Sequence, residues 1–201
     1  MATKADNEVP LCTEKELSGI LVEETGLYAM PSRTYDEITK GLFIGCRSPA
    51  LNKSLLKKLG ITHILNAAQG KKFMHVDTDA DYYKDLNIKY LGLTCSDFES
   101  TNISKHFDTA ADFIADGLNG DHKVLVHCVE GFSRSATLVI AYFMIKRGMT
   151  AQAAVGFVRA SREIGPNDGF LRQICELNKK LHRQKGMENF EENIKLEAAV
   201  D

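Results

Sequence analysis

The sequence predicts one α/β domain with a central, mostly parallel and twisted sheet that is flanked by helices. Short apolar runs, such as ITHILNA at residues 61–67 and KVLVH at residues 123–127, are typical of buried strands. Amphipathic segments of helical length lie between them. With 201 residues, 44% hydrophobic and 26% charged, the chain is long enough to form a core of its own.

The first part of the chain predicts an extension that carries one helix. Thr13 and Glu16 form a capping box at the start of an amphipathic stretch, and Gly26 is expected to stop the helix. We therefore expect an N-terminal extension and helix over residues 1–26 and the main domain over residues 27–185.

The next segments predict the first edge of the sheet. Residues 35–45 (YDEITKGLFIG) favour two short strands around a turn at Lys40 and Gly41. Residues 48–58 favour a helix that Gly60 ends, because glycine readily adopts the left-handed conformation of a helix C-terminus.

Strands and helices then alternate along the chain. Further strands are expected at residues 61–67, 88–93 and 123–127, and helices at residues 104–118, 135–147, 150–162 and after Pro166. Residues 186–201 are acidic and poor in core-forming side chains, so we expect a disordered tail there.

One segment, VLVHCVEGFSRSATLVIAY, carries residues whose chemistry belongs together. It places His127, Cys128, Gly131, Arg134 and Ser135 at the junction between a buried strand and a helix. Backbone N–H groups converge at such a junction, and glycine permits the tight path. We therefore expect a cradle for an anion.

A thiol in this cradle is suited to nucleophilic attack on phosphorus. A helix N-terminus and a neighbouring arginine favour the thiolate, so Cys128 is the candidate nucleophile. The planar fork of Arg134 suits two phosphate oxygens, and Ser135 is the candidate donor to the departing sulfur. His127 is expected to orient the loop. The alternative is a buried structural cysteine beside a surface arginine.

An acid is also needed to protonate the leaving oxygen and then to activate water. Asp97 is the first candidate, because its polar loop follows a strand and a side chain there reaches the carboxyl edge of the sheet. Glu99 is the second candidate. Asp108 and Asp112 fall on the polar face of the following helix and are expected to be solvated.

Charge and cysteine usage exclude several classes of protein. A net charge of -2 gives no reason to expect nucleic acid or a membrane surface as partner. The start lacks the layout of a secretory signal, so we expect an intracellular protein, cytoplasmic or nuclear. The five cysteines are odd in number and widely spread, which favours reduced thiols, and no spacing predicts a metal site or a cofactor.

The segment HCVEGFSRSA, with the preceding Asp97 loop, resembles the dual-specificity protein phosphatases, within the Cys-x5-Arg protein tyrosine phosphatase class. Segments such as LGITHILNAA and REIGPNDGFL extend the resemblance to the small atypical members of that family. It implies a protein tyrosine phosphatase-like fold. It also implies hydrolysis of phosphotyrosine and of phosphoserine or phosphothreonine through a phosphocysteine intermediate, with mitogen-activated protein kinases as expected substrates.

The resemblance further implies which residues contact the substrate. Glu130 and Phe132 would line a shallow pocket, Asn167 would support His127, and Arg162 would hold a second phosphate. The complete expected substrate-binding set is His127, Val129, Glu130, Gly131, Phe132, Ser133, Arg162 and Asn167.

Other readings of the same loop stay open at this point. A phosphoinositide or a phosphorylated RNA end would suit extra lysines better than Val129, Glu130 and Phe132. A phosphate-binding pseudoenzyme and a sulfurtransferase are further alternatives. Cys95 is a candidate partner for a protective disulfide with Cys128 under oxidation. The oligomeric state is not predicted.

Overall fold

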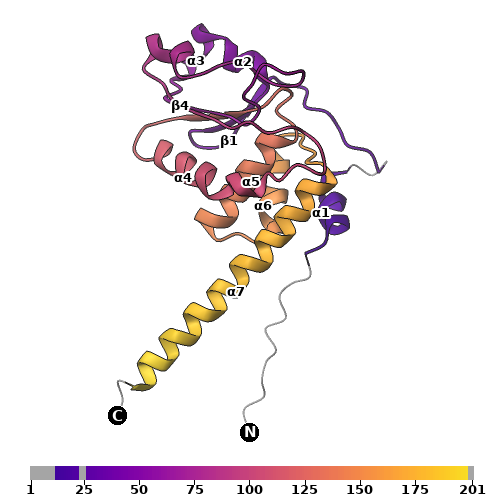
Figure 1. The fold of residues 1–201 in the computed structure, drawn as a ribbon, viewed down its shortest axis with the longest axis vertical. Coiled ribbons are helices and arrows are strands. Elements are labelled where there is room, and N and C mark those ends of the chain that lie inside the picture. Colours follow the sequence, from indigo (N-terminus) through magenta and orange to yellow (C-terminus); the bar gives the residue numbers. More distant parts are fainter. Residues whose placement is uncertain (1–11, 23–25, 199–201) are drawn as a thin grey trace.

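A five-stranded sheet in the order β1-β2-β5-β3-β4 forms the centre of the protein (Figure 1). The computed structural model describes residues 12–22 and 26–198. The strands are β1 (Tyr35–Thr39), β2 (Leu42–Gly45), β3 (His63–Asn66), β4 (Lys89–Gly92) and β5 (Val124–His127). β1 is antiparallel to β2, and the other three pairs are parallel. The expected mostly parallel sheet is confirmed.

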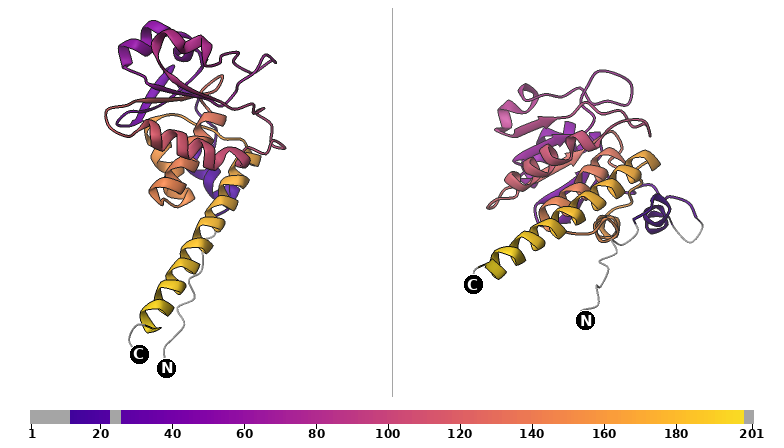
Figure 2. Two further views of the ribbon diagram at one scale, coloured as in Figure 1. Left: turned by 60° about the vertical axis from the view of Figure 1, so that its left-hand side comes forward. Right: turned by 60° about the horizontal axis from the view of Figure 1, so that its bottom comes forward.

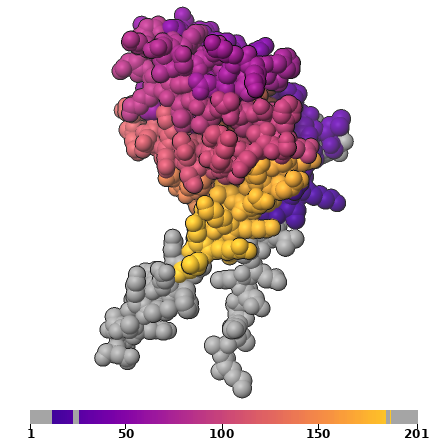
Figure 3. All heavy atoms as spheres, viewed as in Figure 1, coloured from indigo at the N-terminus to yellow at the C-terminus, as the bar shows by residue number. Residues whose placement is uncertain are grey.

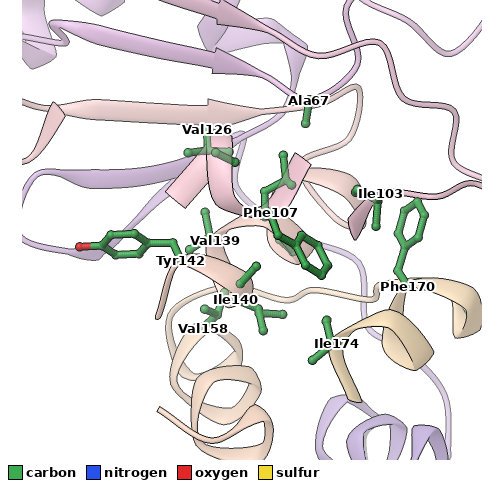
Figure 4. Close-up of a cluster of buried hydrophobic side chains, with 14 of the residues drawn as sticks. Ala67, Ile103, Phe107, Val126, Val139, Ile140, Tyr142, Val158, Phe170 and Ile174 are labelled. Atoms are coloured by element: carbon green, nitrogen blue, oxygen red, sulfur yellow. The ribbon is translucent and has the colours of Figure 1, made fainter. Parts of the chain in front are cut away.

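Alternate residues of the three inner strands point to opposite faces of the sheet, as the two-residue period of a strand requires. Phe43, Leu125 and Ile64 belong to the smaller of two buried apolar clusters. Their neighbours Ile44, Val126 and Leu65 belong to the larger cluster. Figure 4 shows part of the larger cluster, with Val126 of the sheet close to side chains from several helices.

Helices cover both faces of the sheet (Figures 1 and 2). The larger cluster is formed with α1 (Glu14–Leu21), α4 (Phe107–Gly117), α5 (Arg134–Arg147), α6 (Ala151–Ser161) and α7 (Asp168–Ala198). The face of the sheet that contributes to the smaller cluster carries α2 (Arg47–Leu51), α3 (Lys53–Leu59) and the 3₁₀ helix η1 (Asp81–Leu86). The short 3₁₀ helix η2 (Ser104–His106) leads into α4. α5 is buried along most of its length, which holds its first turn rigidly against the sheet.

The helix expected over residues 48–58 is interrupted. It forms α2 and α3, separated at Asn52, whose side-chain oxygen accepts a hydrogen bond from Leu55 N at 3.0 Å and so caps α3. Asparagine favours such caps over helix interiors, and this local preference outweighs continuity of the helix. Gly60, at φ 72°, ends α3 as expected.

The N-terminal helix belongs to the core of the domain. Thr13 caps α1 by accepting a hydrogen bond from Glu16 N at 3.2 Å, and the helix ends at Leu21, before Gly26. Leu17 and Leu21 are fully buried in the larger cluster, so the boundary expected after residue 26 is not a boundary of the core. Residues 1–11 of the expected extension lie outside the described residues.

A disordered tail is expected over residues 186–201, but the structure differs from this expectation over residues 186–198. These residues continue α7 to Ala198, while residues 199–201 lie outside the described residues. Four of the thirteen residues in this segment are glutamate, which favours helices. The segment extends a helix whose first turns pack against the rest of the domain (Figure 3). Propagation from a formed helix costs little, which outweighs the lack of core side chains. No helix in the described part of the chain is long and apolar enough to cross a membrane.

Candidate active site

The cysteine loop lies at the carboxyl end of the central strand. β5 pairs with β2 on one side and β3 on the other, and residues 128–133 join it to α5. Both neighbours of β5 are parallel to it, so their carboxyl ends meet at the same edge of the sheet. Open α/β sheets bind ligands at this edge.

The backbone carbonyls of the loop are all turned away from its interior. Their hydrogen-bond partners are His127 Nδ1 for Cys128 (3.1 Å), Arg47 N for Val129 (2.9 Å), Arg162 Nη2 for Glu130 (3.3 Å), Arg162 Nε for Gly131 (2.8 Å), Gly165 N for Phe132 (3.0 Å) and Thr137 N for Ser133 (2.9 Å). Because each peptide unit points its N–H opposite to its C=O, the amides face the interior.

The Cys128 sulfur lies where these amides point. Gly131 N donates to Cys128 Sγ at 3.2 Å, and Ser135 Oγ lies 3.4 Å from the same sulfur. Gly131 has φ 67°, and a Cβ there would lie 2.5 Å from the carbonyl carbon of Gly45. Only glycine fits this path, as the sequence predicts.

Arg134 is buried at the start of α5 and connects three segments. Its Nη1 donates to Met74 O at 2.8 Å and to Cys95 O at 3.1 Å. Its Nε lies 3.2 Å from Asp97 Oδ2, at an angle that does not make a hydrogen bond, so this buried N–H has no hydrogen-bond partner among the described residues. Such a donor at a site of this kind points to an anionic ligand.

Asp97 is held by side chains from two other loops. Its Oδ1 accepts hydrogen bonds from Ser133 Oγ at 2.8 Å and from Asn167 Nδ2 at 2.9 Å, while Oδ2 faces Arg134. The structure therefore brings Asp97, the first candidate acid, to the arginine of the loop.

The other acidic candidates lie elsewhere. Glu99 is exposed, and its backbone packs against α7, since a Cβ on Gly169 would lie 2.0 Å from Glu99 O. Asp108 and Asp112 are exposed on α4, and Asp112 pairs with Lys146. The expectation that these two are solvated is consistent with their positions.

Two residues expected to contact substrate have other partners. Arg162 does not face solvent: its side chain is 0% exposed and its guanidinium contacts Glu130 O, Gly131 O, Arg33 O and Asp36. Asn167 contacts Asp97 and not His127, because its position at the start of α7 turns the amide toward the acid loop. Both are corrections of the sequence-based expectations.

The rim of the loop is formed by backbone more than by side chains. Val129 is buried in the larger apolar cluster, so its side chain does not line a pocket. Glu130 is exposed, and Phe132 is half-buried with its ring edge-on to Tyr28, 6.3 Å between centroids. Gly165 leaves room for that ring, since a Cβ there would lie 2.2 Å from Phe132 Cζ.

Sequence reasoning missed Met74 and Asp36. Met74 holds the positive φ of 59° that turns its carbonyl to Arg134, and no residue pattern marks a methionine for that conformation. Asp36 lies on β1 and pairs with Arg162. For Asp36, the only indication of a buried partner would have been an acidic residue at an inward-facing position of an edge strand.

Burial shifts the pKa of titratable groups next to the loop. Burial lowers the pKa of His127 to about 4, and its Nδ1 must carry the proton because the carbonyl of Cys128 only accepts. Burial raises the pKa of Cys95 to about 11, which makes it a poor source of thiolate, and its disulfide with Cys128 stays a prediction. Among the described residues, no group of three or more His, Cys, Asp or Glu side chains is arranged to hold a metal ion.

The fold and the loop together define a cysteine-dependent phosphatase. Residues 42–180 match the family described as dual specificity phosphatase, catalytic domain. This match spans more than half of the chain, so the chain belongs to the dual-specificity phosphatases.

Solved structures of relatives agree with this assignment. The phosphatase domain of Yvh1 from Chaetomium thermophilum is 32% identical, with a TM-score of 0.60, covering 71% of this chain and 94% of that domain. The human tyrosine phosphatase-like serine/threonine/tyrosine-interacting protein is 36% identical, with a TM-score of 0.62, covering 72% and 95%. Human DUSP28, at 22% identity, a TM-score of 0.64 and coverage of 77% and 99%, supports the fold.

The buried neutral imidazole predicts how stability depends on pH. Between pH 6.5 and about 4, the unfolded state binds a proton at His127 that the folded state does not, so the free energy of unfolding falls as the pH falls, by up to about 3 kcal/mol from this residue. We expect His127→Asn, which keeps a donor near the position of Nδ1, to show a smaller loss between pH 7.5 and pH 4.5 in urea unfolding. Equal losses in both proteins would contradict burial of a neutral His127.

Proposed function

We propose that Cys128 is the nucleophile of this phosphatase and that it attacks the phosphorus of a phosphorylated protein side chain. The observation that carries the proposal is the orientation of the loop: its carbonyls are all engaged outside, and an N–H lies 3.2 Å from the sulfur. Amides fixed in this way stabilise the equatorial oxygens of the phosphoryl group without reorganisation.

Arg134 would hold the phosphoryl group from the opposite side. Its Nε–H, which has no hydrogen-bond partner among the described residues, lies beside Asp97, so a phosphate oxygen bound there would also lie near the acid. Asp97 would protonate the leaving oxygen, and the P–O bond to the substrate side chain would break as the P–S bond to Cys128 forms.

The second step would hydrolyse the phosphocysteine. Asp97, now ionised, would accept a proton from water as that water attacks phosphorus, and Ser135 would donate to the departing sulfur from its position 3.4 Å away. Ser133 and Asn167 would keep Asp97 in place through both steps.

Apolar side chains beside the site favour aryl phosphates among the substrates. Phe73 is 92% exposed and precedes Met74, which binds Arg134 through its carbonyl. Phe98 is 68% exposed and follows Asp97. Exposed aromatic side chains are suited to contact with a phosphotyrosine ring, while the shallow rim leaves phosphoserine and phosphothreonine accessible.

The finer assignments rest on the resemblance of the sequence. Over residues 27–182 the chain resembles the small atypical phosphatase called VHR, and phosphorylated mitogen-activated protein kinases are the substrates proposed on that basis. A cytoplasmic or nuclear location is proposed with them. A pull-down with a substrate-trapping variant, followed by identification of the captured phosphoprotein, tests the substrate.

A phosphate-binding protein without turnover is the second candidate. It is favoured by the 36% identity to a human protein described as phosphatase-like and interacting. Turnover by the wild-type protein decides between the two.

Removal of the nucleophile should separate binding from catalysis. We expect the wild-type protein to hydrolyse p-nitrophenyl phosphate, Cys128→Ser to lose more than about 1,000-fold in kcat, and tungstate to bind both proteins in calorimetry, because the cradle amides remain. Cys46→Ser, which changes a thiol outside the loop, is the matched control with full activity. Turnover by Cys128→Ser at the wild-type rate would exclude Cys128 as the nucleophile.

The loss of kcat on removal of the acid should depend on the leaving group of the substrate. We expect Asp97→Asn to lower kcat about 100-fold or more for alkyl and phenyl phosphates and much less for p-nitrophenyl phosphate, whose leaving oxygen needs little protonation. Glu99→Gln is the matched control. If Glu99→Gln showed this leaving-group-dependent loss of kcat and Asp97→Asn did not, Glu99 would be the general acid.

A further inference from the structure

Every nitrogen of the Arg162 guanidinium donates to an oxygen atom within the protein. Nε donates to Gly131 O at 2.8 Å, Nη2 to Glu130 O at 3.3 Å, and Nη1 to Arg33 O at 3.0 Å and Asp36 at 2.6 Å. Each nitrogen of the guanidinium is therefore engaged within the protein, and the side chain is fully buried.

Asp36 compensates the buried charge. Its Oδ2 pairs with Arg162, while its Oδ1 lies 2.7 Å from Nε of Arg33, whose side chain is mostly exposed. A buried charge is tolerated when it is paired, and removal of one partner leaves the other uncompensated. The pair connects the loop after β5 to the edge strand β1.

Two consecutive carbonyls of the phosphate loop thus depend on one guanidinium. The planar fork of arginine can hold Glu130 O and Gly131 O together, whereas the single ammonium of lysine cannot reproduce that geometry. If these carbonyls were released, a peptide flip would point an oxygen toward the bound phosphate and withdraw an N–H from it.

We infer that Arg162 and Asp36 are positioning residues, which hold the loop carbonyls outward so that its amides face the phosphoryl group. The inference rests on the proposed function, since it concerns the same loop. As a positioning residue, Arg162 contributes equally to the reaction of every substrate of the site. A role in binding a second phosphate would concern doubly phosphorylated substrates alone.

The test compares Arg162→Lys and Asp36→Asn with the matched control Arg172→Lys, in which an exposed arginine that pairs with Glu14 is changed in the same way. We expect both test variants to lower kcat/KM about 10- to 100-fold and to weaken tungstate binding in calorimetry by a similar factor. The loss should be equal for p-nitrophenyl phosphate, a singly phosphorylated peptide and a doubly phosphorylated peptide. The control should match the wild type.

Two outcomes would overturn the inference. A lower Tm with wild-type kcat/KM and tungstate affinity in the folded variants would make the pair purely structural. A loss confined to the doubly phosphorylated peptide would return Arg162 to substrate binding. Because tungstate affinity is measured without turnover, absence of activity in the wild type would count against the proposed function and still leave the positioning role tested.

A separate observation concerns two cysteines far from the loop in sequence. Cys12 Sγ and Cys175 Sγ lie 2.6 Å apart, and both thiols are buried. Cys12 directly precedes the cap of α1, and Cys175 lies in α7, two helices that lie against each other (Figure 3). Sulfur atoms this close are already placed for a bond between them.

We propose that Cys12 and Cys175 form a reversible disulfide when the protein meets hydrogen peroxide. Both S–H bonds break, one S–S bond forms, and the two electrons reduce the O–O bond of the peroxide to give two molecules of water. The crosslink joins the segment before α1 to the helix that carries Asn167 at its start. In an environment that keeps thiols reduced, the pair remains open.

Peptide mapping under non-reducing conditions tests this proposal in a Cys128→Ser background, which removes the reactive nucleophile. We expect hydrogen peroxide to link the peptides of Cys12 and Cys175, to raise Tm by roughly 5–15 °C, and both effects to reverse with dithiothreitol. Cys12→Ser should abolish both, while Cys46→Ser should abolish neither. Full alkylation of Cys12 and Cys175 after peroxide treatment and unfolding would overturn the proposal.

Discussion

The site depends on the hydrogen bonds that hold the carbonyls of residues 128–133 away from the interior of their loop. A backbone carbonyl that faced a phosphate oxygen would repel it, so an anion cradle requires each carbonyl to have a partner elsewhere. Here the partners come from β5, α2, α5, the residue that follows α6, and the loop before α7. The cradle is therefore a product of the whole domain.

Arg134 and Asp97 add a second level of connection. The arginine holds the carbonyls of Met74 and Cys95, and the aspartate is held by Ser133 and Asn167. Four segments converge on one guanidinium and one carboxylate. Because the groups are largely withdrawn from solvent, their mutual interaction is stronger than it would be in water.

The helices explain why this arrangement is rigid. α5 is buried along most of its length, and α1 and α7 pack on the same core, so the first turn of α5 has little freedom to move. The start of α7 places Asn167 beside Asp97, which ties the acid loop to the same helical layer. Preorganisation of this kind allows fixed dipoles to stabilise a phosphoryl group without further rearrangement.

Much of the site could be predicted from the sequence because its parts are close together in the chain. Cys128, Gly131, Arg134 and Ser135 share one strand-to-helix junction, and local geometry alone places their backbone groups at a common point. The interpretation of Asp97 as a candidate acid came from its position after a strand of a parallel sheet, and the structure places Asp97 beside Arg134. The strands themselves followed from apolar runs, since burial on both faces leaves a clear pattern.

The tertiary structure decided the residues whose roles depend on distant partners. Arg162 is separated from Asp36 by 126 positions and Asn167 from Asp97 by 70, so no local pattern could show that Arg162 is buried and that Asn167 contacts Asp97. Likewise, Val129 is adjacent to Cys128 yet points into the core. The sequence by itself determined the chemistry of the loop, because that chemistry is local. Only the folded chain decided what holds the loop in shape, because those contacts form only when segments far apart in sequence are packed together.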